Sequence, residues 1–334
     1  MKTRRLGPDG PEVSVLGIGA MSFSDMYGPV TEAQAHALLD AALEAGVTHL
    51  DTADIYGMGR SEEAIGRWLA RYRQGGATPF RIATKAGITS DPTTDARVFD
   101  NSAAHLEAAL DASLRRLGLD RVDLFYVHRR DPSHEIEAVT ETLAGLIAKG
   151  KIGAVGFSEI APTSLARAQA VHPVAAVQSE YSLATRLPEL GLVQACEATG
   201  TALVAFSPLG RGLLTDRPPT PDRAAASGFL RSNPRFTGDN LARNVAATAP
   251  FRALAAEMGT TAAALAIAWV LHRSPATLAI PGTRSTAHFA ELVDGATRAL
   301  EPADMAEVAR RLPAGWAHGA RYSAAQSVGP EDYC

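Results

Sequence analysis

The chain has 334 residues, 46% of them hydrophobic and 20% charged, which is the composition of an ordinary globular protein. A formal net charge of −4 argues against nucleic acid or an anionic membrane as a partner. Two distant cysteines, Cys196 and Cys334, do not make a disulfide framework. No apolar segment follows residues 1–5, and the most apolar run, 262–271, is too short to span a bilayer. We therefore expect a cytoplasmic protein without a signal peptide.

The chain begins with a predicted β-hairpin over residues 1–15, because a turn cluster at 7–11 separates two short arms. After it, short apolar runs typical of buried strands alternate with longer segments typical of helices. The predicted strands cover residues 16–20, 47–50, 81–85, 122–128, 152–157, 175–178, 201–206 and 277–280. The predicted helices cover residues 33–45, 62–72, 103–117, 136–148, a segment that starts at 162, 188–198, 241–258, 262–272 and 286–299.

Eight strand–helix units predict parallel strands and an α/β fold of the (β/α)8 TIM-barrel type, which typically needs about 250 residues. The hairpin, a long loop over 207–239 and a tail over 312–334 account for the surplus. Long loops in compact domains are usually functional, and we expect them at the C-terminal face of the barrel. Because no linker is visible, residues 1–334 are predicted to form one domain. The tail could be disordered or could close over the barrel mouth.

Four titratable residues lie at or just after the C-terminal ends of successive predicted strands: Asp51, Tyr56, Lys85 and His128. A barrel brings these ends together over one mouth. An ammonium about 4 Å away would stabilise a phenolate by ~4 kcal/mol at an effective dielectric constant of ~20. Lys85 is therefore expected to lower the pKa of Tyr56 from about 10 toward ~7–8, a useful range for a general acid. This set is suited to protonating a carbonyl oxygen, and a cofactor must then supply hydride.

Taken singly, each of these four residues has an ordinary explanation. Asp51 could cap a loop, Tyr56 could pack in the core, Lys85 could reach solvent, and His128 could belong to a solvated basic patch. Only their joint pattern favours a catalytic site. The paired glycines near residues 17–19 and 57–59 lack the third glycine of a dinucleotide fingerprint and indicate turns.

A metal site is another possibility that the residue types raise. His128, Asp131 and His134 carry ligand groups, but no second cluster completes a ligand set, so we expect no metal.

Several motifs resemble those of the aldo-keto reductase superfamily. The stretch Leu50–Gly57, with Ser61 and Glu62, is similar to the superfamily's signature. The later matching motifs occur in the same order over nearly the whole chain, at residues 83–85, 123–128, 207–212 and 280–284. Residues 127–132 and 178–183 resemble the microbial and plant branch with perakine-reductase-like and pyridoxal-reductase-like members.

The resemblance implies an NADP(H)-dependent enzyme that reduces an aldehyde or ketone to an alcohol, with the cofactor extended across the barrel mouth. Tyr56 would be the proton donor, Lys85 and Asp51 its tuning pair, and His128 the residue that orients the carbonyl. The residues that would contact the nicotinamide are Ser158, Glu159 and Gln178 at its carboxamide and Phe206 at its ring. The pyrophosphate loop would comprise Ser207, Leu209, Gly210 and Arg211, and the adenosine-phosphate segment Gly282, Thr283, Arg284, His288 and Glu291.

Four positions depart from the family pattern. Glu159 stands where many members have asparagine, and Phe206 stands where tyrosine is common. His288 and Leu292 replace an arginine and an asparagine often found near the 2′-phosphate and adenine. Arg284 could still bind that phosphate, because a guanidinium presents a fork of donors. We therefore expect NADP(H) rather than NAD(H).

The expected partner is a small carbonyl compound, in a pocket formed by Met21, Tyr27, Tyr56, His128 and Tyr181. The sequence does not specify the oligomeric state. An alternative function is a non-catalytic, NADPH-binding sensor or regulatory subunit, since potassium-channel β-subunits resemble this family. A metal-dependent barrel hydrolase is a second alternative.

Overall fold

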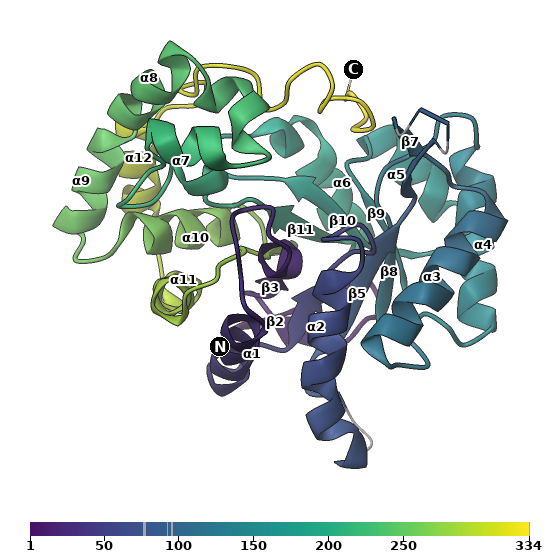
Figure 1. The fold of residues 1–334 in the computed structure, drawn as a ribbon. Coiled ribbons are helices and arrows are strands. Elements are labelled where there is room, and N and C mark those ends of the chain that lie inside the picture. Colours follow the sequence, from purple (N-terminus) through teal and green to yellow (C-terminus); the bar gives the residue numbers. More distant parts are fainter. Residues whose placement is uncertain (76–77, 92, 95, 334) are drawn as a thin grey trace.

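Eight parallel strands form a barrel in the computed structural model, which describes residues 1–75, 78–91, 93–94 and 96–333; Cys334 lies outside them (Figure 1). The barrel strands are β3 (Ile18–Gly19), β4 (His49–Asp51), β5 (Arg81–Ala86), β8 (Leu124–Val127), β9 (Val155–Ser158), β10 (Val174–Glu180), β11 (Ala202–Phe206) and β12 (Thr277–Ala279). Leu16 and Ala279 form a parallel bridge, and the Gly17 N–H donates to the Ala279 carbonyl at 2.8 Å. The first and last strands therefore meet, which confirms the predicted (β/α)8 barrel.

Helices surround the barrel, as the alternation predicts (Figure 1). They are α1 (Glu32–Glu44), α2 (Arg60–Leu69), α3 (Ala103–Leu117), α4 (Ile136–Ala148), α5 (Pro162–Gln169), α6 (Leu192–Thr199), α10 (Ala262–His272) and α11 (Thr286–Thr297). Short 3-10 turns extend some of these units: η1 (Ala20–Phe23), η2 (Ala70–Gly75) and η3 (Leu187–Leu190). The start of α1 follows from its sequence, because Thr31 and Gln34 form a reciprocal capping box.

The predicted N-terminal hairpin is present and closes one end of the barrel. Strands β1 (Thr3–Arg5) and β2 (Glu12–Ser14) pair antiparallel. Leu6 and Val13 of this hairpin are buried and pack against side chains of the barrel interior, including Leu124 and Tyr126. The other end of the barrel, where the parallel strands finish, carries the long loops.

Two predictions about the segment after β11 are wrong in detail. The expected helix over 241–258 is two helices, α8 (Asp239–Ala247) and α9 (Ala249–Glu257), because Pro250 opens the second one. The expected loop over 207–239 contains helix α7 (Pro221–Ala226) and the turns η4 (Gly210–Gly212), η5 (Leu230–Ser232) and η6 (Pro234–Phe236).

Two elements were not predicted from the sequence. A second hairpin, β6 (Ile88–Ser90) with β7 (Arg97–Phe99), follows β5. Helix α12 (Pro302–Arg311) precedes the tail. A capping box between Glu301 and Asp304, with Pro302 at the first helical position, was a readable signal for this helix.

Among the described residues, no single helix is long and apolar enough to cross a membrane. Asp239–Glu257 and Ala262–His272 pass this test only as a pair, by length and composition, and the pair is bent by 91°.

Candidate active site

The barrel brings the four predicted catalytic residues together at the C-terminal ends of its strands. Asp51 ends β4, Lys85 lies near the end of β5, and His128 directly follows β8. Tyr56 lies in the turn between β4 and α2, where its N–H donates to the Ala53 carbonyl at 3.2 Å. Three adjacent strands and one turn thus place these side chains over one mouth.

Asp51 and Lys85 form a buried ion pair. Lys85 Nζ donates to Asp51 Oδ1 and, at 2.7 Å, to the Thr52 carbonyl. Gln178 from β10 donates to the other carboxylate oxygen of Asp51 at 2.8 Å. Burial raises the pKa of Asp51 and lowers the pKa of Lys85, while the attraction between the two charges opposes both shifts. The pair is therefore held by hydrogen bonds in a site that disfavours isolated charges.

The structure contradicts the expected direction of the Tyr56 pKa shift. Lys85 Nζ lies 5.2 Å from the centroid of the Tyr56 ring. Burial, followed by the negative charge of Asp51, raises the pKa of Tyr56, and the positive charge of Arg129 opposes this only in part. The prediction of a lowered pKa was wrong because burial and the Asp51 carboxylate outweigh the effect of the lysine. Tyr56 consequently stays a neutral phenol at neutral pH and retains a proton that it can donate.

His128 faces Tyr56 and is also neutral. The two rings meet edge to face, with centroids 5.8 Å apart and an interplanar angle of 83°. Burial, with the positive charges of Arg129 and Lys85, lowers the pKa of His128 well below its ordinary value. Its Nδ1 atom is buried and has no hydrogen-bond partner among the described residues.

The described part of the chain contains no group of three or more His, Cys, Asp or Glu side chains that could hold a metal ion.

The residues predicted to hold the nicotinamide carboxamide lie beside this set, at the ends of β9 and β10. Gln178 contacts Asp51, as described above, and Ser158 Oγ accepts a hydrogen bond of 3.0 Å from Arg129. Phe206, predicted to stack on the nicotinamide ring, ends the neighbouring strand β11 and is half-buried. These positions are adjacent in space although they are far apart in the sequence.

Glu159 contacts the protein's own C-terminal tail. Its carboxylate accepts the Glu180 N–H at 2.7 Å and pairs with Arg321 at 2.6 Å. The same tail arginine lies 3.9 Å from Glu180, a fully buried carboxylate that also pairs with Arg211 at 2.6 Å. Burial alone would raise the pKa of Glu180, but Arg211, Arg235 and Arg321 together lower it. The sequence did not single out Glu180 or Arg235, since neither lies at a position that the resemblance assigns a role.

The predicted pyrophosphate loop has an unusual backbone. Ser207 and Arg211 have φ values of 50° and 58°, and Glu159 on the neighbouring strand end has 59°. Non-glycine residues in this left-handed region are strained, and such strain clusters at functional sites. In the same loop, between Ser207 and Arg211, Leu209 is half-buried and Gly210 is buried. The guanidinium of Arg211 lies 4.3 Å from the centroid of the Phe229 ring.

The predicted adenosine-phosphate residues lie around the N-terminus of α11. Gly282, Thr283 and Arg284 connect β12 to this helix, and His288 and Glu291 lie in its first two turns. The Ser285 hydroxyl caps the helix by accepting the His288 N–H at 3.3 Å, and Arg284 donates to the Pro29 carbonyl at 2.6 Å. A helix N-terminus with an adjacent arginine is suited to a phosphate.

The residues predicted to form the substrate pocket do not all lie together, because one of them is in the core. Met21 in η1 and Tyr27 in the loop after it are half-buried, and Tyr27 is near enough to Tyr56 to affect its pKa. Tyr181, in contrast, is fully buried, and its hydroxyl donates to Glu189 at 2.9 Å. Its ring packs against Trp269 of α10, so it lies in the core between barrel and helix and not in the pocket.

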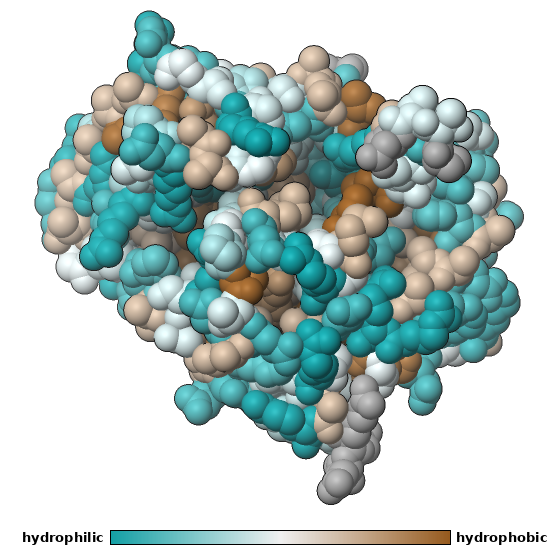
Figure 2. Space-filling view, viewed as in Figure 1, coloured by the Kyte–Doolittle hydropathy of each residue, from teal (hydrophilic) through white to brown (hydrophobic). Residues whose placement is uncertain are grey.

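The C-terminal tail packs over the strand ends instead of being disordered, and Figure 1 shows it crossing from α12 toward β7. The Trp316 indole N–H donates to the Leu183 carbonyl at 2.9 Å. Near the end of the tail, Glu331 pairs with Arg130 at 3.1 Å and accepts the Ala161 N–H at 2.7 Å. Figure 2 shows a hollow on this face of the molecule, between the part formed by α7 and α8 and the part that carries β7.

Comparison with known proteins agrees with this geometry. The sequence model of the Aldo/keto reductase family matches residues 15–312. The chain is 36% identical to the aldo-keto reductase yakc [NADP(+)] of Schizosaccharomyces pombe, over 96% of this chain and 94% of that protein. It is 34% identical to the probable aldo-keto reductase 1 of Glycine max, over 95% of this chain and 91% of that protein.

Solved structures share the fold of this chain. The glycerol dehydrogenase AKR11B4 of Gluconobacter oxydans superposes with a TM-score of 0.79 at 28% identity, covering 93% of this chain and 96% of that one. The holo form of aldo-keto reductase AKR11C1 from Bacillus halodurans has the same fold, with a TM-score of 0.78 at 24% identity and coverage of 98% and 99%. By sequence and by fold, this chain belongs to the aldo-keto reductase family of oxidoreductases.

Proposed function

We propose that the protein reduces an aldehyde or ketone to an alcohol with NADPH, and that Tyr56 is the proton donor. The observation that carries this proposal is the meeting of Tyr56, His128 and the Asp51–Lys85 pair at one barrel mouth. The yeast relative's name specifies NADP(+), which supports the choice of cofactor.

The residues at the mouth suit NADPH. The α11 N-terminus and Arg284 would hold the 2′-phosphate, and the loop that starts at Ser207 would hold the pyrophosphate. Phe206 would stack on the nicotinamide, and Gln178 would contact its carboxamide. When bound, NADPH supplies the hydride that reaches the carbonyl carbon.

The chain's own residues would handle the carbonyl oxygen. Neutral His128 donates a hydrogen bond to that oxygen and fixes its position beside the Tyr56 hydroxyl. Tyr56, a neutral phenol at neutral pH, transfers its proton as negative charge develops on the oxygen. The ammonium of Lys85 and the guanidinium of Arg129 then stabilise the phenolate that remains.

The test is Tyr56→Phe, which removes the proton and keeps the ring. We expect NADPH-dependent reduction of an aromatic aldehyde to fall by about 10²–10⁴-fold, the usual contribution of a general acid. The affinity for NADPH, followed by fluorescence titration, should hardly change. Tyr72→Phe is the matched control, since Tyr72 packs on Trp68 away from the mouth. A Tyr56→Phe enzyme as active as wild type would contradict the mechanism, and a wild type that binds NADPH without turnover on any carbonyl would favour the sensor alternative.

A further inference from the structure

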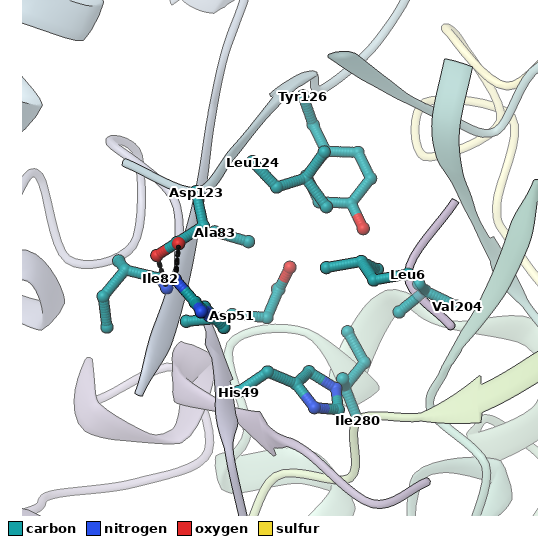
Figure 3. A pocket seen from close by; sticks show the side chains of 11 residues that line it. Leu6, His49, Asp51, Ile82, Ala83, Asp123, Leu124, Tyr126, Val204 and Ile280 are labelled. Atoms are coloured by element: carbon teal, nitrogen blue, oxygen red, sulfur yellow. Dashed lines mark hydrogen bonds and ion pairs between the residues drawn. The ribbon is translucent and has the colours of Figure 1, made fainter. Parts of the chain in front are cut away.

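A small cavity lies inside the barrel, between Asp51 and the N-terminal hairpin. Its volume is about 10 Å³ as space for the centre of a water molecule, which is about the size needed to hold one water. Figure 3 shows the Asp51 carboxylate, the Tyr126 hydroxyl, the Leu6 side chain and the His49 imidazole around it. Most of the lining is apolar. Two of its polar residues, Arg81 and Asp123, pair with each other at 3.0 Å, and the others are Asp51, Tyr126 and His49.

His49 is placed in this cavity by the pairing of β3 and β4. Side chains alternate along a strand, so His49 and Asp51 project to the same face of β4. The residue next to the imidazole is Gly17, which directly precedes β3. No side chain fits there, because a Cβ atom on Gly17 would come within 2.1 Å of His49 Nε2. Gly17 thus provides the space that the imidazole occupies.

The imidazole is an unusual group for such a place. His49 is only 6% exposed, and neither of its ring nitrogens has a hydrogen-bond partner among the described residues. Burial lowers the pKa of His49 to about 4, so the ring is neutral at neutral pH and has one donor and one acceptor. Buried polar groups without partners are rare and costly, and buried water is the usual partner where no protein group is available.

Asp51 has the capacity for a further hydrogen bond. A carboxylate offers about four lone-pair sites, and Lys85 and Gln178 occupy one on each oxygen. We propose that His49 is a positioning residue, which is linked to the Asp51 carboxylate by hydrogen bonds through one water held in this cavity. The role in catalysis rests on the proposed function, whereas the link itself does not.

The link would act on Tyr56 through Asp51 and Lys85. A hydrogen bond donated to a carboxylate favours its charged form. A charged Asp51 keeps Lys85 protonated in front of the Tyr56 ring. Without the link, Asp51 keeps its bonds to Lys85 and Gln178 but loses one donor that favours its charged form.

The first test is independent of activity. In the protein labelled with 15N-histidine, the His49 resonances are identified as those missing from His49→Gln. We expect a single neutral tautomer with a slowly exchanging ring N–H, and we expect these resonances to shift in Asp51→Asn. A ring that interconverts between tautomers and does not respond to Asp51→Asn would overturn the link. A high-resolution crystal structure should show one water within hydrogen-bond distance of both side chains.

The second test is kinetic. His49→Leu should lower kcat about tenfold, the effect of losing one hydrogen bond to a charged group, with the NADPH affinity unchanged. His49→Gln should retain most of the activity, because an amide also donates and accepts. Full activity in a folded His49→Leu variant would overturn the positioning role. If the wild type reduced no carbonyl, the proposed function would fail, and the NMR result would still decide whether the link exists.

Discussion

At the scale of single residues, the charge state of Asp54 makes stability depend on pH near neutrality. It lies between Asp51 and Tyr56 in the chain, and its N–H donates to the Lys85 carbonyl at 3.1 Å. One carboxyl oxygen is buried without a hydrogen-bond partner among the described residues. Burial, followed by the negative charge of Glu62, raises the pKa of Asp54 to about 7, against the weaker effects of a hydrogen bond from the Ile55 N–H and of the charge of Arg116.

This shift predicts how stability depends on pH. Because the folded pKa of about 7 exceeds the unfolded value near 4, the folded state holds the proton more tightly. The contribution of Asp54 is therefore fully present in acid and is lost as the pH rises through 7, by at most ~4 kcal/mol. Asp54→Asn should remove this loss. The free energy of unfolding of the variant, measured by urea denaturation, should therefore increase relative to that of wild type between pH 5 and pH 8. The exposed Asp222→Asn is the control, and equal pH profiles for Asp54→Asn and wild type would contradict the prediction.

Cofactor choice is also decided at this scale. If Arg284 binds the 2′-phosphate, Arg284→Met should weaken NADPH binding by about 10–100-fold, the effect of losing a charge-assisted hydrogen bond. NADH lacks this phosphate, so its affinity is the internal control and should change little. Fluorescence titration with both cofactors measures the difference. An equal loss for NADH and NADPH would show that Arg284 acts only through its contact with Pro29.

The sequence predicted which residues meet at the mouth but not their charge states. Asp51, Tyr56, Lys85 and His128 each follow a strand, and a barrel collects strand ends, so the meeting follows from topology. The pKa of Tyr56 depends on burial and on the orientation of Asp51, which have no signature in one dimension. Tyr181 was misplaced for the same reason, because the direction of a side chain just beyond a strand is set by packing.

At the scale of elements, the packing of α10 against α11 depends on a glycine. Gly295 of α11 faces α10, where an added Cβ atom would come within 2.3 Å of the Ala264 carbonyl oxygen. The two helices can therefore approach each other only because this side chain is absent. Gly145 of α4 is exposed and has nothing within 4 Å of the same added atom.

These two glycines form a matched pair for mutation. Gly295→Ala should destabilise the protein by about 1–3 kcal/mol through overpacking, although alanine favours a helix. Gly145→Ala should instead stabilise it by about 0.5–1 kcal/mol, because only the helix propensity changes. Urea denaturation measures both, and a stabilising Gly295→Ala would show that α10 and α11 can separate without cost.

Elements were predictable where their patterns are strong. The barrel strands are short apolar runs, and the helices between them have clear amphipathic faces or caps, as at Thr31. Helix α12 was missed because only one of its residues, Val308, is buried, so its apolar pattern is weak. The hairpin of β6 and β7 was missed because its three-residue strands are mostly not buried, so no apolar run marks them.

At the scale of the whole molecule, the C-terminal tail connects segments that the barrel holds apart. Trp316 contacts the segment after β10, Asn233 of the long loop donates to the Arg321 carbonyl at 2.7 Å, and Glu331 reaches the segment after β9. The sequence left open whether the tail packs, because none of these contacts is local. The tail also joins Arg321 to the buried carboxylates Glu159 and Glu180.

Removing the Arg321 charge should therefore destabilise the whole fold. Arg321→Gln leaves two buried carboxylates with fewer partners, and breaking a buried pair costs about 3–5 kcal/mol; partial exposure of Arg321 places the expected loss near ~3 kcal/mol. Because neighbouring arginines hold the pKa of Glu180 below its usual value, their contribution is present at neutral pH and disappears as the pH falls through that lowered pKa. The loss measured by urea denaturation should thus be larger at pH 7 than in acid. Arg310→Gln removes the same charge from an exposed pair with Glu307 and should have little effect. Equal losses in the two variants would mean that the tail covers the mouth without stabilising the fold.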